Sequence, residues 1–300
     1  MKPNSNDELK TLPDFDSLWD YDHPEQTELK FREIESSAKN SRNKSYYLQL
    51  LTQIARTQGL QRKFVEAHKT LDIVEKLLTT DLIQVRIRYL LERGRVYNSS
   101  KDKEKARPLF LEAWETANAD KEDFYAIDAA HMMGIIEPSE QQLKWNLKAL
   151  ALAEKSSEPK SKKWLGSLYH NIGWTYHDLK QYDKALEIFN KGLVWRIEKK
   201  SEPEIRIAKW CIARTYRSMG KLQEAVDIQK ELLNEIEIKK AEPDGYVFEE
   251  LGECLLLMGQ KKEAQKYFNF AYDILSKDKW LVANEPKRLE RLKELGTEKF

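Results

Sequence analysis

The chain has 300 residues, of which 34% are charged and 41% hydrophobic, and its formal net charge is +1. So small a net charge gives the whole chain no electrostatic preference for nucleic acid or for an anionic membrane surface. The 11 glycines and 9 prolines are few for a β-rich or disordered chain. No apolar run approaches the roughly 20 residues that a membrane-spanning helix needs. Composition therefore predicts amphipathic helices with one wet face.

Residues 1–20 are predicted to be a flexible segment, because they carry two prolines and little periodicity. Phe15, Leu18 and Trp19 are the side chains of this segment that can pack onto the first helices. The first 16 residues are polar and contain no apolar core, so we expect no secretion signal. We therefore expect a cytoplasmic location, which also fits two cysteines that form no disulfide framework.

A capping helix is predicted over residues 21–41. The tetrapeptide DHPE at 22–25 is typical of a helix start, because proline and acidic residues are favoured in the first turn. Leu29, Phe31 and Ile34 then recur at helical spacing. We expect this helix to cover the first repeat of the array that follows.

A pattern of small residues recurs from residue 42 to residue 278. One lies on the first helix of each expected pair, and successive ones are separated by 39, 36, 43, 40 and 39 residues. They are Ala55, Gly94, Ala130, Gly173, Ala213 and Gly252. An alanine follows twelve residues later in every unit except the third, where Gln142 stands. The recurrence predicts six antiparallel helix pairs whose backbones approach closely at these positions.

The fourth unit shows the pattern most completely, in the stretch YHNIGWTYHDLKQYDKALEIFNKG at 169–192. The residues that carry it are Tyr169, Ile172, Gly173, Tyr176, Ala185 and Phe189. This stretch resembles the tetratricopeptide repeat (TPR), whose consensus is W-x2-L-G-x2-Y followed by A-x3-F. The resemblance implies an all-α, right-handed superhelical solenoid. Because the spacings here exceed the 34 residues of that repeat, we expect longer second helices and linkers.

Residues 279–300 are predicted to form a C-terminal capping helix. Leu289, Leu292 and Leu295 make one apolar stripe among charged neighbours. The end unit of a solenoid must present a polar face to water, and this stripe leaves one.

The resemblance also implies a binding surface, since TPR proteins hold peptides or partner proteins on a concave face lined mainly by the first helix of each pair. The candidate groove residues are Arg56, Arg95, Asn98, His131, His170, Trp174, His177, Trp210, Arg214 and Arg217. Guanidinium groups bind carboxylates through paired hydrogen bonds. The groove is therefore predicted to take an acidic ligand or a free C-terminal carboxylate, with the tryptophans as aromatic contacts.

Each residue type in this set has a second interpretation. The arginines would instead form ion pairs between neighbouring repeats, and the tryptophans would be buried between repeats. The histidines would make a pH-sensitive groove or a metal site, but no carboxylate or cysteine stands at ligand spacing on their face. We therefore predict no metal and no cofactor. Cys211 and Cys254 are predicted to be apolar fillers, because no histidine lies near either in sequence to act as a base.

The predicted function is a non-catalytic scaffold that binds a protein or peptide. The alternative is a ligand-gated regulator similar to the bacterial peptide-sensing TPR receptors, which carry an additional effector domain. About 40 residues precede the first helix pair, fewer than an ordinary separate domain needs. An enzyme is a third option without a supporting motif, because the sequence contains no phosphate-binding glycine loop, G-x-S-x-G or H-E-x-x-H.

Overall fold

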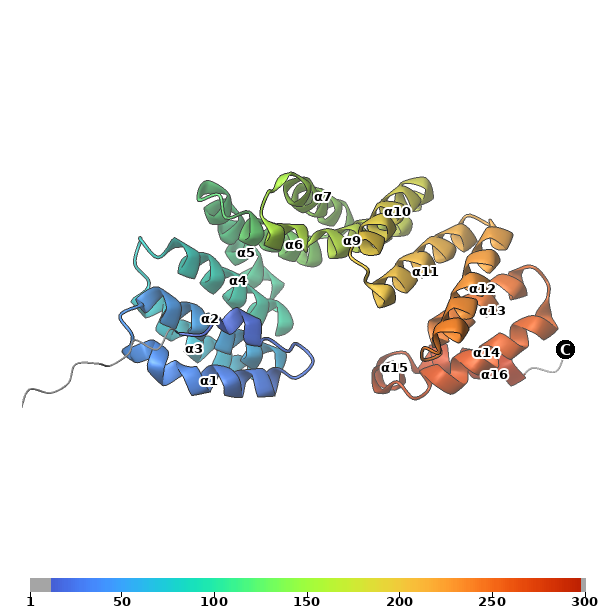
Figure 1. The fold of residues 1–300 in the computed structure, drawn as a ribbon, viewed down its shortest axis with the longest axis horizontal. Helices are drawn as coiled ribbons and strands as arrows, with labels where there is room; N and C mark the ends of the chain where they lie inside the picture. The colour runs from blue at the N-terminus through green and yellow to red at the C-terminus, as the bar shows by residue number, and fades with distance from the viewer. Residues whose placement is uncertain (1–11, 298–300) are drawn as a thin grey trace, which may run out of the picture. The chain divides into compact units, whose positions relative to one another are not determined.

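The amphipathic stripes of the sequence pack as antiparallel helix pairs (Figure 1). The computed structural model describes residues 12–297, and every regular element within them is a helix. The pairs in that range are α2 (Lys44–Leu60) with α3 (Phe64–Leu77), α4 (Ile83–Ser99) with α5 (Lys103–Ala119), α6 (Asp123–Ile136) with α7 (Ser139–Lys155), α9 (Leu165–Asp178) with α10 (Tyr182–Glu198), α11 (Glu202–Ser218) with α12 (Leu222–Lys239), and α13 (Gly245–Leu257) with α14 (Lys261–Leu275). The prediction of an all-α fold of about six helix pairs is confirmed.

Five shorter or terminal elements flank these pairs. They are η1 (Phe15–Leu18), α1 (Pro24–Asn40), α8 (Pro159–Lys162), α15 (Lys279–Asn284) and α16 (Pro286–Thr297). The chain divides into two compact units, which we call unit 1, ending at Trp164, and unit 2, beginning at Leu165. Unit 1 holds η1 and α1 to α8, and unit 2 holds α9 to α16. No helix within residues 12–297 is both long and apolar enough to cross a membrane.

Glycine is required on three first helices because a phenylalanine ring of the second helix lies against the backbone. A Cβ added at Gly94, Gly173 or Gly252 would lie 3.0 Å or less from the nearest ring carbon, closer than side chains normally come. The rings belong to Phe110, Phe189 and Phe268, sixteen residues further along. All three rings are buried. The predicted close approach of the two helices is therefore real in these pairs.

The third pair corrects the predicted register. The glycine pressed against the second helix there is Gly134, whose added Cβ would meet the Asn146 side chain. Asn146 lies only twelve residues later, because the turn at Glu137 and Pro138 makes this hairpin about one helical turn shorter. The equivalent of Gly94 is thus Gly134 and not Ala130. With that change, the steps between successive small residues become 39, 40, 39, 40 and 39.

A left-handed turn residue closes five of the six hairpins in the described chain. It falls seven residues after the small residue, at Arg62, Lys101, Lys180, Gly220 and Gly259. Backbone with positive φ ends a helix sharply and is uncommon for residues with a Cβ. Its recurrence at one fixed offset supports the repeat register independently of the side-chain packing.

The aromatic side chains of the N-terminal segment pack onto the first helices, as expected for Phe15 and Trp19. Residues 1–11 lie outside the described range, but Phe15 is only 6% exposed and packs edge-on against Phe31 and Tyr46. Trp19 packs against Phe31 and donates a hydrogen bond to Gln53. Phe15 and Trp19 therefore add their aromatic side chains to the unit 1 core.

Candidate partner-binding surfaces

The first helices of unit 2 present a row of aromatic side chains. Trp174 on α9 lies 6.0 Å from Trp210 on α11, and Trp210 lies 6.5 Å from Tyr246 on α13, between ring centroids. The Trp210 indole N–H donates to the Tyr246 carbonyl at 3.1 Å. Arg288 of α16 then covers the Tyr246 ring, 5.2 Å from its centroid. Both tryptophans are half-buried. Their exposure therefore falls between the two predictions, an exposed aromatic contact and full burial between repeats.

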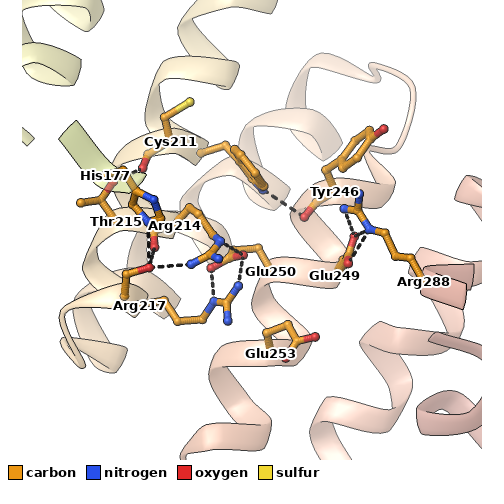
Figure 2. Close-up of polar contacts among 12 residues, drawn as sticks. His177, Cys211, Arg214, Thr215, Arg217, Tyr246, Glu249, Glu250, Glu253 and Arg288 are labelled. Atoms are coloured by element: carbon orange, nitrogen blue, oxygen red, sulfur yellow. Dashed lines mark hydrogen bonds and ion pairs between the residues drawn. The ribbon is translucent and has the colours of Figure 1, made fainter. Parts of the chain in front are cut away.

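Beside this row, Arg214 and Arg217 of α11 converge on Glu250 of α13 (Figure 2). Arg217 donates to both carboxylate oxygens, at 2.5 and 2.9 Å, and the Arg214 Nε lies 3.6 Å away. Glu250 is only 3% exposed. Burial lowers the pKa of Arg217, but the hydrogen bonds and charge of Glu250 outweigh it, so this pKa is raised. Burial and the neighbouring Arg217 charge lower the pKa of Arg214.

The small cleft at this position is balanced in charge. It has a volume of about 230 Å³ and contains three arginines and three glutamates. Its lining residues are Trp210, Arg214, Arg217, Tyr246, Glu249, Glu250, Glu253 and Arg288. Arg288 pairs with Glu249 at 2.6 Å, as Figure 2 shows. The ion pairs between repeats that the sequence left open are thus present here.

The two histidines predicted for this face contact the neighbouring first helix. His177 Nε2 lies 2.9 Å from the Ser218 hydroxyl, and His170 Nδ1 lies 3.8 Å from the Cys211 sulfur. The Cys–His contact was missed because 41 residues separate the two. Burial raises the pKa of Cys211 to about 12, so the thiol stays protonated and is a poor nucleophile. His170 lies three residues before Gly173, and Cys211 lies two residues before Ala213. These similar positions in successive repeats would have placed the two side chains on facing helices.

The first helices of unit 1 border a larger pocket, with a volume of about 630 Å³. Its lining residues are Asp14, Asp16, Ser17, Trp19, Tyr21, Gln53, Arg56, Arg88, Leu91, Glu92, Arg95, Phe124, Tyr125, Asp128, Lys160, Lys163 and Trp164. Arg56 and Arg95 both line it. Asn98 and His131 are not among its lining residues. His131 instead packs on Trp164, 5.1 Å between ring centroids, in the position equivalent to His170.

Arg56 and Arg95 each pair with a carboxylate of the next first helix, and Arg95 also pairs with one on its own helix. Glu92 of α4 lies 3.4 Å from Arg56 and 2.7 Å from Arg95, and Arg95 also bonds Asp128 of α6. Both acids are buried, at 5% and 7% exposed. The arginines of unit 1 therefore link α2, α4 and α6, as those of unit 2 link α11 and α13.

Arg88 is the pocket residue that sequence reasoning missed. It donates to the Tyr125 hydroxyl at 2.7 Å and to the Asp16 carboxylate, while its side chain is only 8% exposed. Burial lowers its pKa, and Tyr125 and Asp16 more than compensate, so the pKa is raised. Arg88 precedes Arg95 by seven residues, which is two helical turns, so their shared face could have been found from the sequence.

Clusters of three or more potential metal ligands are absent from residues 12–297.

Comparison with known proteins finds one repeat match and several similar proteins. Residues 166–195 match the family model of the tetratricopeptide repeat. Outer dynein arm-docking complex subunit 4 of Bos taurus is 29% identical over 205 residues, covering 64% of this chain and 29% of that protein. The match thus spans less than a third of that relative's length.

Two proteins of known structure share the fold over nearly the whole chain. Apo RapI superposes with a TM-score of 0.74 at 17% identity, covering 92% of this chain and 78% of its own. The quorum sensor NprR of B. thuringiensis superposes in its apo form with a TM-score of 0.65 at 13% identity, covering 95% and 81%. NprR with its cognate peptide NprX gives 0.54 at 16% identity, covering 93% and 82%. Residues 166–195 thus match the tetratricopeptide repeat, and the fold of the chain is similar to that of these solved structures.

Proposed function

We propose that the chain is a non-catalytic scaffold that holds a peptide or a protein on the first-helix face of its repeats. The observation that carries this proposal is the aromatic row of unit 2, in which Trp174 and Trp210 are half-buried and Tyr246 is exposed. Indole and phenol rings beside arginine are typical of the residues that contribute most to binding energy at protein interfaces.

The similar proteins support the same class of function. NprR has been solved with a cognate peptide, and the Bos taurus relative is a subunit of a docking complex. A peptide or protein partner for this chain follows from those relatives and from the aromatic row together. The cytoplasmic location predicted from the sequence is part of the proposal.

The acidic ligand predicted from Arg214 and Arg217 requires an exchange of partners in unit 2. Glu250 already accepts hydrogen bonds from Arg217 and lies beside Arg214. A ligand carboxylate would have to replace it or share the two guanidinium groups. In unit 2, the aromatic row is therefore the main contact and the arginines are the polar border.

Affinity capture from the native cell extract tests the proposal. We expect Trp210→Ala to lower the affinity for the captured partner by about tenfold or more, as truncating a central aromatic contact does. We expect Arg214→Ala with Arg217→Ala to weaken capture less. Lys262→Gln with Lys266→Gln on α14 is the control, since both lysines are exposed and lie outside the cleft.

Circular dichroism verifies that each variant is folded. If folded Trp210→Ala protein captures the same partner with unchanged affinity, the first-helix face of unit 2 is not the binding surface. If the control pair lowers capture as much as Trp210→Ala does, the effect is general and the proposal is wrong.

The second candidate function is a peptide-gated regulator, favoured by the fold shared with NprR over 95% of this chain. Such a protein would change compactness when a peptide binds. Small-angle scattering with and without a captured peptide separates the two functions: a lower radius of gyration supports the regulator, and an unchanged one supports the scaffold.

A further inference from the structure

The pocket of unit 1 is closed on one side by the chain's own N-terminal segment. Asp14, Asp16, Trp19 and Tyr21 line it from that segment, opposite residues of the first helices and the stretch 160–164. We propose that this pocket binds an acidic peptide segment, and that Asp16 occupies at Arg88 the place of one ligand carboxylate. The proposal deepens the binding function above and rests on it only in taking the ligand to be a peptide.

The walls of the pocket carry an excess of positive charge. Apart from the N-terminal segment, the walls carry five basic side chains and two acidic ones. The basic ones are Arg56, Arg88, Arg95, Lys160 and Lys163, and the acidic ones are Glu92 and Asp128. Asp14 and Asp16 of the segment offset part of this excess. The walls thus favour an anionic occupant, and the chain supplies a partial one.

Two lysines of the pocket wall have no acidic partner within the described part of the chain. Lys160 and Lys163 are exposed and form no ion pair with any residue in 12–297. By contrast, Arg56 and Arg95 are neutralised by Glu92 and Asp128. The lysines are therefore available to a ligand carboxylate without breaking an existing contact, unlike the arginines of unit 2.

The pocket is also lined by residues with buried N–H groups that have no hydrogen-bond acceptor in the described part of the chain. Arg88 Nη1, Arg95 Nε and Trp164 Nε1 are inaccessible to solvent and have no hydrogen-bond acceptor among residues 12–297. All three residues line the pocket. Buried N–H groups are normally satisfied, and an orphaned one needs an explanation. A carboxylate with two acceptor oxygens is the ligand group that matches a guanidinium donor.

Asp16 is suited to exchange. Its side chain is 42% exposed, whereas that of its partner Arg88 is 8% exposed. The segment is anchored by Phe15 and Trp19, which pack on Phe31. The Asp16 carboxylate can consequently rotate into solvent while the segment stays in place, which opens Arg88 to an incoming carboxylate.

Fluorescence anisotropy with labelled hexaglutamate tests the proposal on the full chain, with hexaglutamine as the uncharged probe. We expect Asp16→Asn to bind hexaglutamate about tenfold more tightly than wild type, because a competing charge-assisted hydrogen bond is removed. We expect Lys160→Gln with Lys163→Gln to bind about fivefold more weakly and with a smaller salt dependence. Lys30→Gln with Lys69→Gln, exposed lysines of unit 1 outside the pocket, is the matched control and should not differ from wild type.

Three results would overturn the proposal: equal binding of the two probes, equal effects of the two lysine pairs, or weaker binding by folded Asp16→Asn protein. If Asp16→Asn fails to fold, the lysine pairs decide alone, because neither makes a contact that the fold needs. Trp210→Ala separates this site from that of unit 2. It should leave hexaglutamate binding unchanged even if it abolishes capture of the native partner.

Discussion

Arg217 on α11 and Glu250 on α13 form a two-point contact, in which one guanidinium donates to both oxygens of a carboxylate that is 3% exposed. In unit 1, Arg95 on α4 also pairs with a buried carboxylate, that of Asp128 on α6, but through a single hydrogen bond. Removing one partner of a buried pair leaves the other charge without compensation, which costs more than the pair itself contributes.

Glu250→Ala should therefore lower the free energy of unfolding by about 3 kcal/mol. Replacing both partners, Arg217→Met with Glu250→Met, should cost less than Glu250→Ala alone, because no buried charge is then left at these two positions. Urea unfolding of the three proteins measures this. If the double methionine variant costs as much as Glu250→Ala or more, the coupling is contradicted.

Gly173→Ala should destabilise the fold by about 1–3 kcal/mol, because the added methyl group overlaps the Phe189 ring. Gly59→Ala is the matched control. The nearest atom to its added Cβ belongs to Val96, at an ordinary 3.5 Å, so replacing this helical glycine should stabilise by up to about 1 kcal/mol. Thermal unfolding of both variants separates packing from helix propensity.

Gly134→Ala tests the corrected register of the third helix pair. The added Cβ would overlap Asn146, so we expect a loss of about 1–3 kcal/mol, similar to that of Gly173→Ala. If Ala130 were instead the residue of closest approach, Gly134→Ala would be neutral or stabilising. The midpoint of urea unfolding decides between the two.

Acid should weaken the fold through its half-buried histidines. Burial lowers the pKa of His68, His131, His170 and His177 below the ordinary 6.5. The unfolded chain then binds protons more readily, so these groups destabilise the fold as the pH falls below about 6.5. Unfolding in urea at pH 7.5 and 5.5 should show lower stability at 5.5, and His131→Gln with His170→Gln should reduce the difference. If the difference in stability between pH 7.5 and 5.5 is unchanged in this variant, these two histidines do not cause it.

Cys211 should resist alkylation in the folded protein. The thiol is buried, and burial raises its pKa to about 12, so almost no thiolate is present at pH 8. Iodoacetamide followed by peptide mass spectrometry should find it unmodified in buffer and modified in urea. Rapid labelling of the folded protein would instead point to an activated thiol beside His170.

The fold followed from the sequence because the repeat pattern is local and regular. Gly94, Gly173 and Gly252 mark the close approach of two helices, and each can be recognised from one hairpin at a time. The predicted register of the third unit was wrong because a shorter turn at Pro138 moves Gly134 by one helical turn relative to its partner Asn146. Only the contact with Asn146 reveals that shift.

The candidate site was less accessible to sequence reasoning, because its partners come from different repeats. The position of Arg217 was predictable, but its bond to Glu250 depends on which faces of α11 and α13 meet. Likewise, Arg88 meets Asp16 across 72 residues. No periodicity in the sequence carries that contact, because the N-terminal segment lies outside the repeats.

The ion pairs between successive first helices also define which neighbour each repeat accepts. Arg95 requires a carboxylate at the place of Asp128, and a different repeat inserted there would bury a cation against an unsuitable surface. Deleting, duplicating or shuffling single helix pairs should therefore succeed only where the charges at the new junction match. The facing charges of neighbouring first helices thus limit which repeat can follow which.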